Sequence, residues 1–417
     1  MGGGSGGHIT PIVAVINKLL NDPSSNRAAE DSSVGGKERS AKPASRPSLQ
    51  REGRCLHREG SSYDIRVWCD RKFAPQAKKL LADANVRVDI IAAGKLRRYA
   101  NLKWWYRWFS PYHIIHTHIP NFIDMFKIAG GFIQSLCKML VWRPDVVFCK
   151  GGYVSLPVGI VAHLYHIPLV IHDSDTVPGL TNRVLAKYAS AIGTGAPVEN
   201  YPSYPKRITK FIGIPVGDNV KHISETERTN LKHELGLDSN RPLVLAMGGG
   251  QGAVAINDAI TANATKLVKD KVNVVLLAGR GREVNMPKSV GKHVQVLEFT
   301  NRVTDYEQAA DVVVTRAGAT TMAELAAIGV ATIIVPSPYL AGDHQTKNAK
   351  VYEKAGAAVV LNEFELKDNP QILYDAIGDL LTNKGKRAKL AKNLRAFAKP
   401  DALDGMVQMI LDACKDK

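Results

Sequence analysis

The stretch Leu243-Val-Leu-Ala-Met-Gly-Gly-Gly-Gln-Gly-Ala-Val254 decides the fold class of this chain. Five apolar residues run without a break, as in a strand that is buried on both faces, and glycines follow at once. Glycines let the backbone turn tightly into a helix N-terminus, where amide groups can approach a phosphate. The order of strand, glycine loop and helix therefore predicts a parallel α/β unit.

Short apolar runs alternate with helical stretches on both sides of this unit. They are 64–68, 86–91, 144–149, 168–172 and 208–212 before it, and 272–278, 294–298, 311–315, 331–335 and 357–361 after it. Because 417 residues are too many for one hydrophobic core, we expect two doubly wound domains. We assign 1–215 to the first and 216–399 to the second. A final helix over 400–417 is expected to pack back toward the first.

Composition limits the class of protein. The hydrophobic fraction of 45% is that of a folded globular chain, and no apolar run reaches the roughly 18 residues of a membrane span. Five scattered cysteines without a CxxC pair argue against a disulfide framework or a zinc site. The net charge of +16 favours a polyanionic partner, which nucleic acid, an anionic membrane or a phosphorylated substrate could each supply. No secretory signal is seen, so a cytosolic or surface-bound protein is expected.

The first 62 residues contain two unusual segments. Gly2–Gly7 and His8 precede a predicted helix over 10–20, yet no strand comes before this glycine loop. Either the natural start lies elsewhere, or the domain lacks a central strand. Residues 21–62 are rich in Ser, Gly, Pro and charge and hold no aromatic residue, so we predict a disordered insertion.

Two further loops follow strands and open helices. One is Gly151-Gly-Tyr153, and the other is Arg316-Ala-Gly-Ala-Thr-Thr-Met-Ala-Glu324. None of the loops reads GxxxxGK[ST], which argues against a Walker-type NTPase, and no acidic residue completes a dinucleotide fingerprint. Taken alone, the second loop favours an ordinary helix start that has a stabilising acid in its first turns over a ligand site.

Six motifs occur in a fixed order along the chain. They are Gly2–Pro11, Gly151–Ser155, His172–Arg183, Gly249–Ala253, Arg316–Glu324 and Asp343–Ala349. In this order they closely resemble the MurG family, bacterial enzymes that add N-acetylglucosamine (GlcNAc) to undecaprenyl-pyrophosphoryl-MurNAc-pentapeptide (lipid I) to make lipid II. The resemblance implies a GT-B fold, in which two Rossmann-like domains with parallel sheets face a cleft. It covers nearly the whole chain apart from 21–62 and part of 95–130.

The resemblance also implies roles for individual residues. The donor UDP-GlcNAc would contact Ser5, Gly6, Gly7, Asp175, Gly249, Gly250, Gln251, Gly252, Thr300, Ala319, Thr320, Thr321, Met322, Ala323, Glu324 and Gln345. Among these, Glu324 would hold the ribose hydroxyls, the backbone of Thr300 would read uracil, and Gln345 would contact GlcNAc. The acceptor would contact Gly151, Gly152, Tyr153 and Asn182.

Transfer requires a base for the attacking hydroxyl on C4 of MurNAc. His8 is the candidate, because imidazole titrates near working pH; the competing interpretation is a helix-start residue that only forms hydrogen bonds. Asp173-Ser-Asp175 matches the DxD pattern of metal-dependent glycosyltransferases, yet GT-B enzymes need no metal for this step, so no metal and no other cofactor is expected. Two departures from the family are Asp175, where an amide is usual, and Gly217, where an arginine contacts the donor.

The segment Lys95–Phe109 combines five basic residues and six aromatic ones without an acid. Trp104, Trp105, Trp108 and Phe109 suit a membrane interface, and each cation near anionic lipid contributes about 1 kcal/mol. The same pattern suits single-stranded nucleic acid, but the glycosyltransferase motifs favour a membrane. We therefore expect a peripheral protein on the cytoplasmic side of a bacterial plasma membrane. The expected partners are UDP-GlcNAc, lipid I and other cell-wall synthesis proteins, and no nucleic acid is expected.

Three alternatives stay open at this level. A different lipid glycosyltransferase or a UDP-GlcNAc 2-epimerase could use a similar fold. A degenerate nucleotide-sugar-binding protein at the membrane would bind UDP without turnover. Release of UDP that depends on lipid I would distinguish the lipid I GlcNAc transferase from these alternatives.

Overall fold

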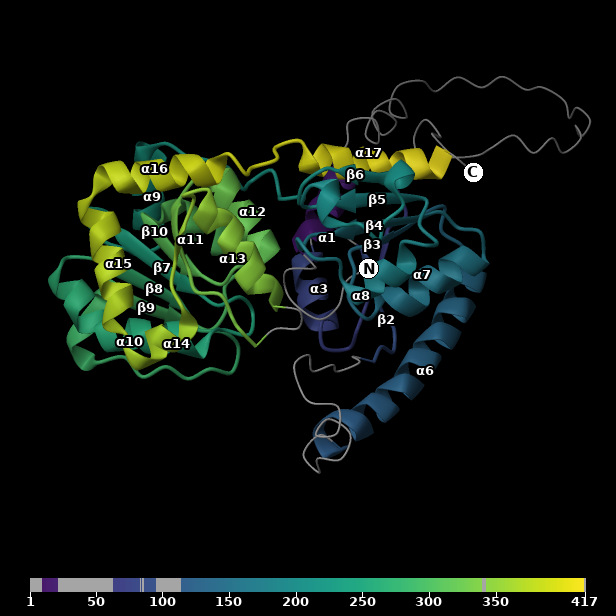
Figure 1. Ribbon diagram of the computed structural model, residues 1–417, viewed down its shortest axis with the longest axis horizontal. Helices are drawn as coiled ribbons and strands as arrows, with labels where there is room; N and C mark the ends of the chain where they lie inside the picture. The colour runs from purple at the N-terminus through teal and green to yellow at the C-terminus, as the bar shows by residue number, and fades with distance from the viewer. Residues whose placement is uncertain are drawn as a thin grey trace, which may run out of the picture.

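The computed structural model describes residues 10–21, 63–82, 84, 86–94, 114–339 and 343–415. Two α/β domains lie side by side, each built on parallel strands with helices around them (Figure 1). The expected insertion over 21–62 falls, except for Asn21, outside the described residues. No helix within the described part is both long and apolar enough to cross a membrane.

The C-terminal domain contains a parallel sheet of six strands in the order β12-β11-β10-β7-β8-β9. Its central strands are buried along their whole length, which explains their unbroken apolar sequences. The strand order turns back between β7 and β10, and ligands of open α/β sheets bind at such a switch point, beyond the carboxyl ends of the strands. The strands are β7 (Leu243–Met247), β8 (Asn273–Leu277), β9 (Val294–Leu297), β10 (Val312–Thr315), β11 (Ala331–Ile334) and β12 (Val359–Val360).

The N-terminal domain contains two separate sets of parallel strands, β1-β2 and β3-β4-β5-β6. A cavity of about 310 Å³ lies between β1 and β3, and Val67, Phe148 and Val15 are among the residues that line it. Within the described residues, β1 pairs only with β2 and β3 only with β4. The strands are β1 (Arg66–Cys69), β2 (Arg87–Ile90), β3 (Val147–Cys149), β4 (Leu169–Asp173), β5 (Ala191–Thr194) and β6 (Thr209–Phe211).

Helices cover the faces of the sheets in both domains. In the N-terminal half they are α1 (Thr10–Leu20), α3 (Ala74–Leu80), η3 (Ile114–His118), α6 (Ile119–Val141), α7 (Ser155–Leu164), α8 (Leu180–Leu185), η4 (Val198–Asn200) and η5 (Lys206–Ile208). In the C-terminal half they are α9 (Glu225–Glu234), α10 (Val254–Lys269), η6 (Lys288–His293), α11 (Val303–Ala309), α12 (Ala319–Ile328), α13 (His344–Lys354), α14 (Glu363–Asp368), α15 (Gln371–Thr382), α16 (Lys384–Arg395) and α17 (Ala402–Lys415).

The last helix belongs spatially to the first domain. α17 packs on α1 in a shared apolar cluster that includes Val15, Leu19, Met406 and Ile410. Figure 1 shows the chain leaving α16 on the C-terminal domain and crossing to α17 above β6 and β5. The two domains are thus joined by two crossings of the chain, one after β6 and one before α17.

Candidate active site

The loop after β7 leaves open space at a helix N-terminus. Gly249 and Gly252 have positive φ angles of +75° and +70°. A Cβ on Gly252 would lie 1.9 Å from the Ala278 carbonyl oxygen, so this glycine is required by packing. Nothing lies within 4 Å of a Cβ on Gly249 or Gly250. Together with the N-terminus of α10, this open backbone can accept a diphosphate.

The loop after β10 opens α12 at the same edge of the sheet. Gly318 is the N-cap residue and has no side chain to bond the first amides, and neither Thr320 nor Thr321 is the cap residue. Burial raises the pKa of Glu324, one turn into α12, to about 7. Its neighbour Glu307 is 1% exposed with both carboxylate oxygens unbonded, and burial raises its pKa further. A carboxyl group with a raised pKa at this position can exchange hydrogen bonds with sugar hydroxyls in either protonation state.

An aromatic–cation pair stands beside the predicted uracil position. The Arg280 guanidinium lies 4.3 Å from the centre of the Phe299 ring, and Thr300 follows directly after it. The Thr300 hydroxyl accepts from the Arg302 amide at 3.0 Å, which fixes this turn. Sequence reasoning singled out Thr300 but missed Arg280, although a cation three residues beyond β8 was visible in the sequence.

The loop after β11 leads to Gln345 at the start of α13. Its Oε1 accepts from the Ser337 amide at 3.0 Å, so the amide NH₂ is the group that can serve a ligand. Three residues on, Asn348 is 3% exposed and bonds across to the N-terminal domain: its Oδ1 accepts from Thr176 Oγ1 at 2.7 Å. Sequence reasoning did not single out Thr176 or Asn348.

On the N-terminal domain the predicted acceptor residues gather at the ends of β3 and β4. Gly151 and Gly152 have φ angles of +93° and +81°. A Cβ on Gly151 would lie 3.0 Å from Asn182 Nδ2, and that amide group donates to the His172 carbonyl at 3.2 Å. The Tyr153 hydroxyl donates to Asp70 at 2.6 Å, so its position is set by a loop of the β1-β2 unit.

The two carboxylates of Asp173-Ser-Asp175 differ in their surroundings. Asp173 is 5% exposed, and its Oδ2 accepts from the Tyr204 hydroxyl at 2.7 Å and from the Gly179 amide at 3.0 Å. Burial raises its pKa. Asp175 is half-buried, and its carbonyl oxygen accepts from Tyr201 at 2.6 Å. Asp173 therefore serves the fold of this loop, while the side chain of Asp175 is the more accessible of the two.

A buried polar chain behind this loop was missed by sequence reasoning. Lys150, which is 1% exposed, donates to the Ser174 hydroxyl. Ser174 contacts His172 Nδ1 at 3.4 Å, and His172 Nε2 donates to the Gly213 carbonyl at 2.8 Å. Burial lowers the pKa of Lys150 to about 8, and burial beside Lys150 holds the pKa of His172 well below its ordinary value. This row of hydrogen-bonded groups connects β3, β4 and the crossing after β6.

A cavity of about 900 Å³ lies between the domains. Ser174, Thr176 and Gly195 line it from the N-terminal domain, and Ala319 and Met322 line it from α12. Gly217 and Lys221 also line it, from the crossing after β6, so the chain places a lysine in the same cavity as the glycine that stands where the family has arginine. Segments that follow β4, β5 and β6 thus meet α12 around one space. Of the predicted site residues, Ala319, Met322 and Ala323 line it, whereas Gly151–Tyr153, Asn182 and Gly249–Gly252 do not.

Several predicted residues cannot be placed. Ser5, Gly6, Gly7 and His8 lie outside the described residues, as do Trp104, Trp105, Trp108 and Phe109. Among the residues that are described, no group of three His, Cys, Asp or Glu could hold a metal ion.

Solved structures share this architecture. MurG of Acinetobacter baumannii matches with a TM-score of 0.61 and 22% identity, covering 98% of both chains. A UDP-N-acetylglucosamine 2-epimerase matches with a TM-score of 0.57 and 10% identity, covering 96% of this chain and 92% of the other. At these identities the likeness shows the fold alone, and that fold is GT-B.

Sequence relatives identify the family. Residues 113–194 match the glycosyltransferase family 28 N-terminal domain, and residues 243–406 match its C-terminal domain. The UDP-N-acetylglucosamine–N-acetylmuramyl-(pentapeptide) pyrophosphoryl-undecaprenol N-acetylglucosamine transferase of Acetivibrio thermocellus is 32% identical over 298 residues, covering 70% of this chain and 79% of the relative. The enzyme of the same name from Idiomarina loihiensis is 34% identical over 296 residues, covering 69% and 78%. The chain therefore belongs to the MurG family of glycosyltransferases.

Proposed function

We propose that this chain transfers GlcNAc from UDP-GlcNAc to the C4 hydroxyl of MurNAc in lipid I, forming lipid II with inversion of the anomeric centre. One observation carries the proposal: the segments that follow β4, β5 and β6 and the helix that follows β10 line one cavity between the domains, where Thr176 of one domain bonds Asn348 of the other. A donor held by one domain and an acceptor held by the other would meet there. The names of the curated relatives supply the two substrates.

The donor is assigned to the C-terminal domain. Its diphosphate would lie against Gly249 and Gly250, where no protein atom occupies the space, and near the N-termini of α10 and α12. Uracil would bind at Thr300 beside the stacked Arg280 and Phe299, and ribose would bond Glu324.

Departure of UDP develops negative charge that must be stabilised without reorganisation. Two helix N-termini directed at the diphosphate provide this, which is why no metal is required. The hydrogen bonds that Asp173 accepts from Tyr204 and Gly179 also argue against a metal, because they use one of the two DxD carboxylates to hold the loop.

The acceptor is assigned to the N-terminal domain, at Gly151, Gly152, Tyr153 and Asn182. The C4 hydroxyl must lose its proton as it attacks the anomeric carbon, and His8 is the proposed base. One displacement from an α-linked donor then gives a β-linked product.

The N-terminal domain also carries a face suited to a bilayer. Phe122 and Phe126 are 60% and 62% exposed and contact each other edge to face at 5.1 Å. Further exposed apolar side chains on the same segment are Ile115, Ile119, Ile123 and Met125. Further along α6, Phe132 and Leu136 pack in the apolar cluster that holds Val158 and Val161 of α7. Such a face, which follows the aromatic and basic segment 95–109 in the sequence, supports peripheral binding to the cytoplasmic side of the plasma membrane, where a lipid-linked acceptor resides.

The test is release of UDP from UDP-GlcNAc with and without a lipid I analogue, in the presence and absence of EDTA. We expect release that depends on the analogue and survives EDTA, and a loss of about 10² or more in His8→Ala. Release that does not need the analogue would favour an epimerase or hydrolase. UDP binding without any release would favour a degenerate binding protein.

A further inference from the structure

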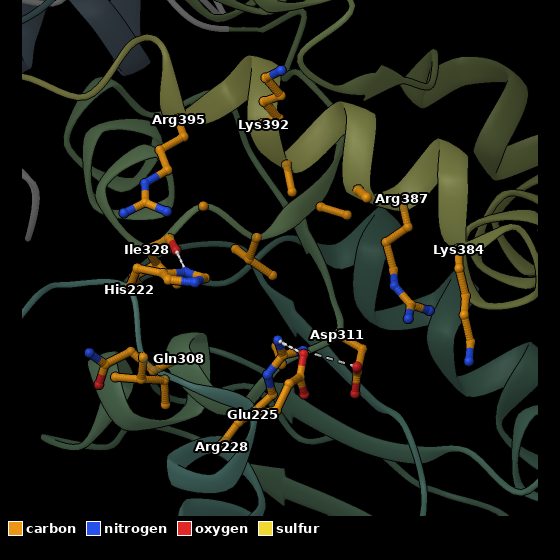
Figure 2. A pocket seen from close by; sticks show the side chains of 17 residues that line it. His222, Glu225, Arg228, Gln308, Asp311, Ile328, Lys384, Arg387, Lys392 and Arg395 are labelled. Atoms are coloured by element: carbon orange, nitrogen blue, oxygen red, sulfur yellow. Dashed lines mark hydrogen bonds and ion pairs between the residues drawn. The ribbon is translucent and has the colours of Figure 1, made fainter.

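Another cavity, separate from the two described above, lies on the C-terminal domain, at the end of the sheet away from the glycine loops. It has a volume of about 450 Å³ and lies between α9, α16 and the beginnings of β10 and β11, with Asp311 and Ala331 in its lining (Figure 2). The proposed donor site lies beyond the carboxyl ends of the strands, whereas this cavity lies at their amino ends. The proposed function leaves it without a role.

The wall formed by α16 is strongly basic. α16 carries six cations and no acid in twelve residues. Figure 2 shows Lys384, Arg387 and Arg395 extending from α16 toward the opposite wall of the cavity, while Lys392 points away. Within the part of the chain that the structure describes, no carboxylate pairs with any of the three.

The acids on the opposite wall are already neutralised. Asp311 pairs with Arg228 at 3.1 Å and with Lys232 at 2.7 Å, and it also accepts from the Leu243 amide at 2.8 Å. Glu225 pairs with Arg228 at 2.7 Å. The positive charge of Lys384, Arg387 and Arg395 is therefore not balanced by these acids, and the concave shape of the site concentrates its electric field.

Several of the basic groups are held in place by the fold. Arg387 donates to the carbonyls of Leu380 and Leu381 at the end of α15, at 3.3 and 3.2 Å. The stem of Arg395 packs over Gly329, where an added Cβ would lie 3.3 Å from Arg395 Cδ. His222 Nδ1 donates to the Ile328 carbonyl at 2.9 Å, which directs the ring into the lining. Groups fixed before binding lose less entropy when a ligand arrives.

We propose that this cavity binds a small phosphate-bearing anion from solution. Two guanidinium groups and an ammonium group around one space suit phosphate oxygens, which arginine bonds in pairs. A lipid headgroup offers the same chemistry, but Figure 1 places α16 and α6 at opposite ends of the molecule. A bilayer that contacts α6 would therefore lie far from α16. The inference goes beyond the proposed function, because the donor diphosphate has its own site at Gly249–Gly252.

The test is calorimetric titration of the full-length protein with inorganic diphosphate at low ionic strength. Saturating UDP is present throughout, so that the proposed donor site is filled. Because His222 and Arg395 also line the interdomain cavity, Lys384→Gln, which lies outside that lining, is titrated as well. The site variant is Lys384→Gln/Arg395→Gln. The matched control is Lys386→Gln/Lys389→Gln, which removes two charges from the same helix but outside the cavity lining.

We expect diphosphate to bind the UDP-saturated protein, the site variant to bind about tenfold more weakly, and the control to bind within about twofold of the unaltered chain. Absence of binding to the unaltered chain, or equal weakening in both variants, would overturn the proposal. If the site variant unfolds, Lys384→Gln alone against Lys389→Gln gives the same comparison, since both side chains are exposed. Vesicles of anionic phospholipid distinguish the source: we expect both variants to bind them equally, and a selective loss in the site variant would assign the cavity to a headgroup and overturn the soluble ligand.

Discussion

Thr176 Oγ1 donates a 2.7 Å hydrogen bond to Asn348 Oδ1 across the boundary between the two domains. Asn348 is itself held by its Nδ2, which donates to the Ala317 carbonyl at 3.1 Å in the loop that opens α12. The bond thus connects the loop after β4, on the acceptor side, to the loop that we assign to the donor. It is a direct structural link between the two halves of the proposed site.

Replacing Thr176 with valine removes this link while keeping the shape of the side chain. A net hydrogen bond is worth about 1 kcal/mol, so kcat/KM for UDP-GlcNAc should fall about fivefold if the closed arrangement is the active one. Thr382→Val is the matched control, because the Thr382 hydroxyl bonds the Gly378 carbonyl within its own helix. Equal kinetics in the two variants would show that the cross-domain bond has no part in turnover.

Gly249→Ala should separate donor binding from stability. The added methyl meets no protein atom, but it enters the space assigned to the diphosphate and takes up a positive φ of +75°. We expect about 1 kcal/mol of lost stability and a rise of at least about tenfold in the dissociation constant for UDP.

Gly291→Ala provides the comparison for that measurement. Gly291 also has a positive φ, +52°, and open space around it, but it lies before β9, at the opposite end of that strand from Thr300. It should keep its affinity for UDP. Because its ψ of −145° lies near a region that is essentially restricted to glycine, it should lose at least as much stability. A Gly249→Ala protein that binds UDP normally would place the diphosphate elsewhere.

Buried Glu307 and its half-buried neighbour Glu324 should make stability depend on pH. Burial raises both pKa values, that of Glu324 from 4.5 to about 7, so the folded state holds protons that the unfolded state releases. This contribution to stability is complete below about pH 4.5 and is lost as pH rises through 7 and beyond. Urea unfolding at about pH 5 and about pH 8 measures the decline.

Glu307→Gln should flatten that decline, because it removes the more deeply buried carboxylate and the repulsion that it exerts on Glu324. Glu353→Gln, at an exposed position on α13, should leave the decline unchanged. If the Glu307→Gln protein loses as much stability between the two pH values as the unaltered chain, the pair is not the source of the effect.

Phe126→Ser should weaken binding to vesicles of anionic phospholipid. The ring is 62% exposed on α6, and burying such a side chain in an apolar phase is worth about 1.5–3 kcal/mol, which corresponds to about tenfold or more in partitioning. Phe364→Ser removes a ring of similar exposure, 52%, from the C-terminal domain and should have no effect. Sedimentation with vesicles gives both values, and equal losses would remove α6 from the membrane face.

The sequence was sufficient to predict the alternation of strands and helices. The helix over 10–20 was predicted at the bounds that the structure gives to α1, and the apolar run 243–247 forms β7. Such runs are decided locally, because strands buried on both faces must be apolar along their whole length.

What sequence reasoning missed depends on contacts between distant segments. α6 continues through Gly130 and Gly131, which usually interrupt a helix. A Cβ on Gly131 would lie 2.0 Å from the Ala92 carbonyl oxygen, so the glycine is explained only by the backbone that packs against it. Likewise, Lys150, Ser174 and His172 form a chain only because β3 and β4 are neighbours in the sheet.

The most direct test of the account is the identity of the product formed from UDP-GlcNAc and a lipid I analogue. NMR of the purified lipid product should show GlcNAc joined to C4 of MurNAc by a β linkage, with one UDP released for each disaccharide formed. An α linkage would contradict the single displacement. Conversion of UDP-GlcNAc to another sugar nucleotide, with the lipid I analogue unchanged, would contradict the transferase itself.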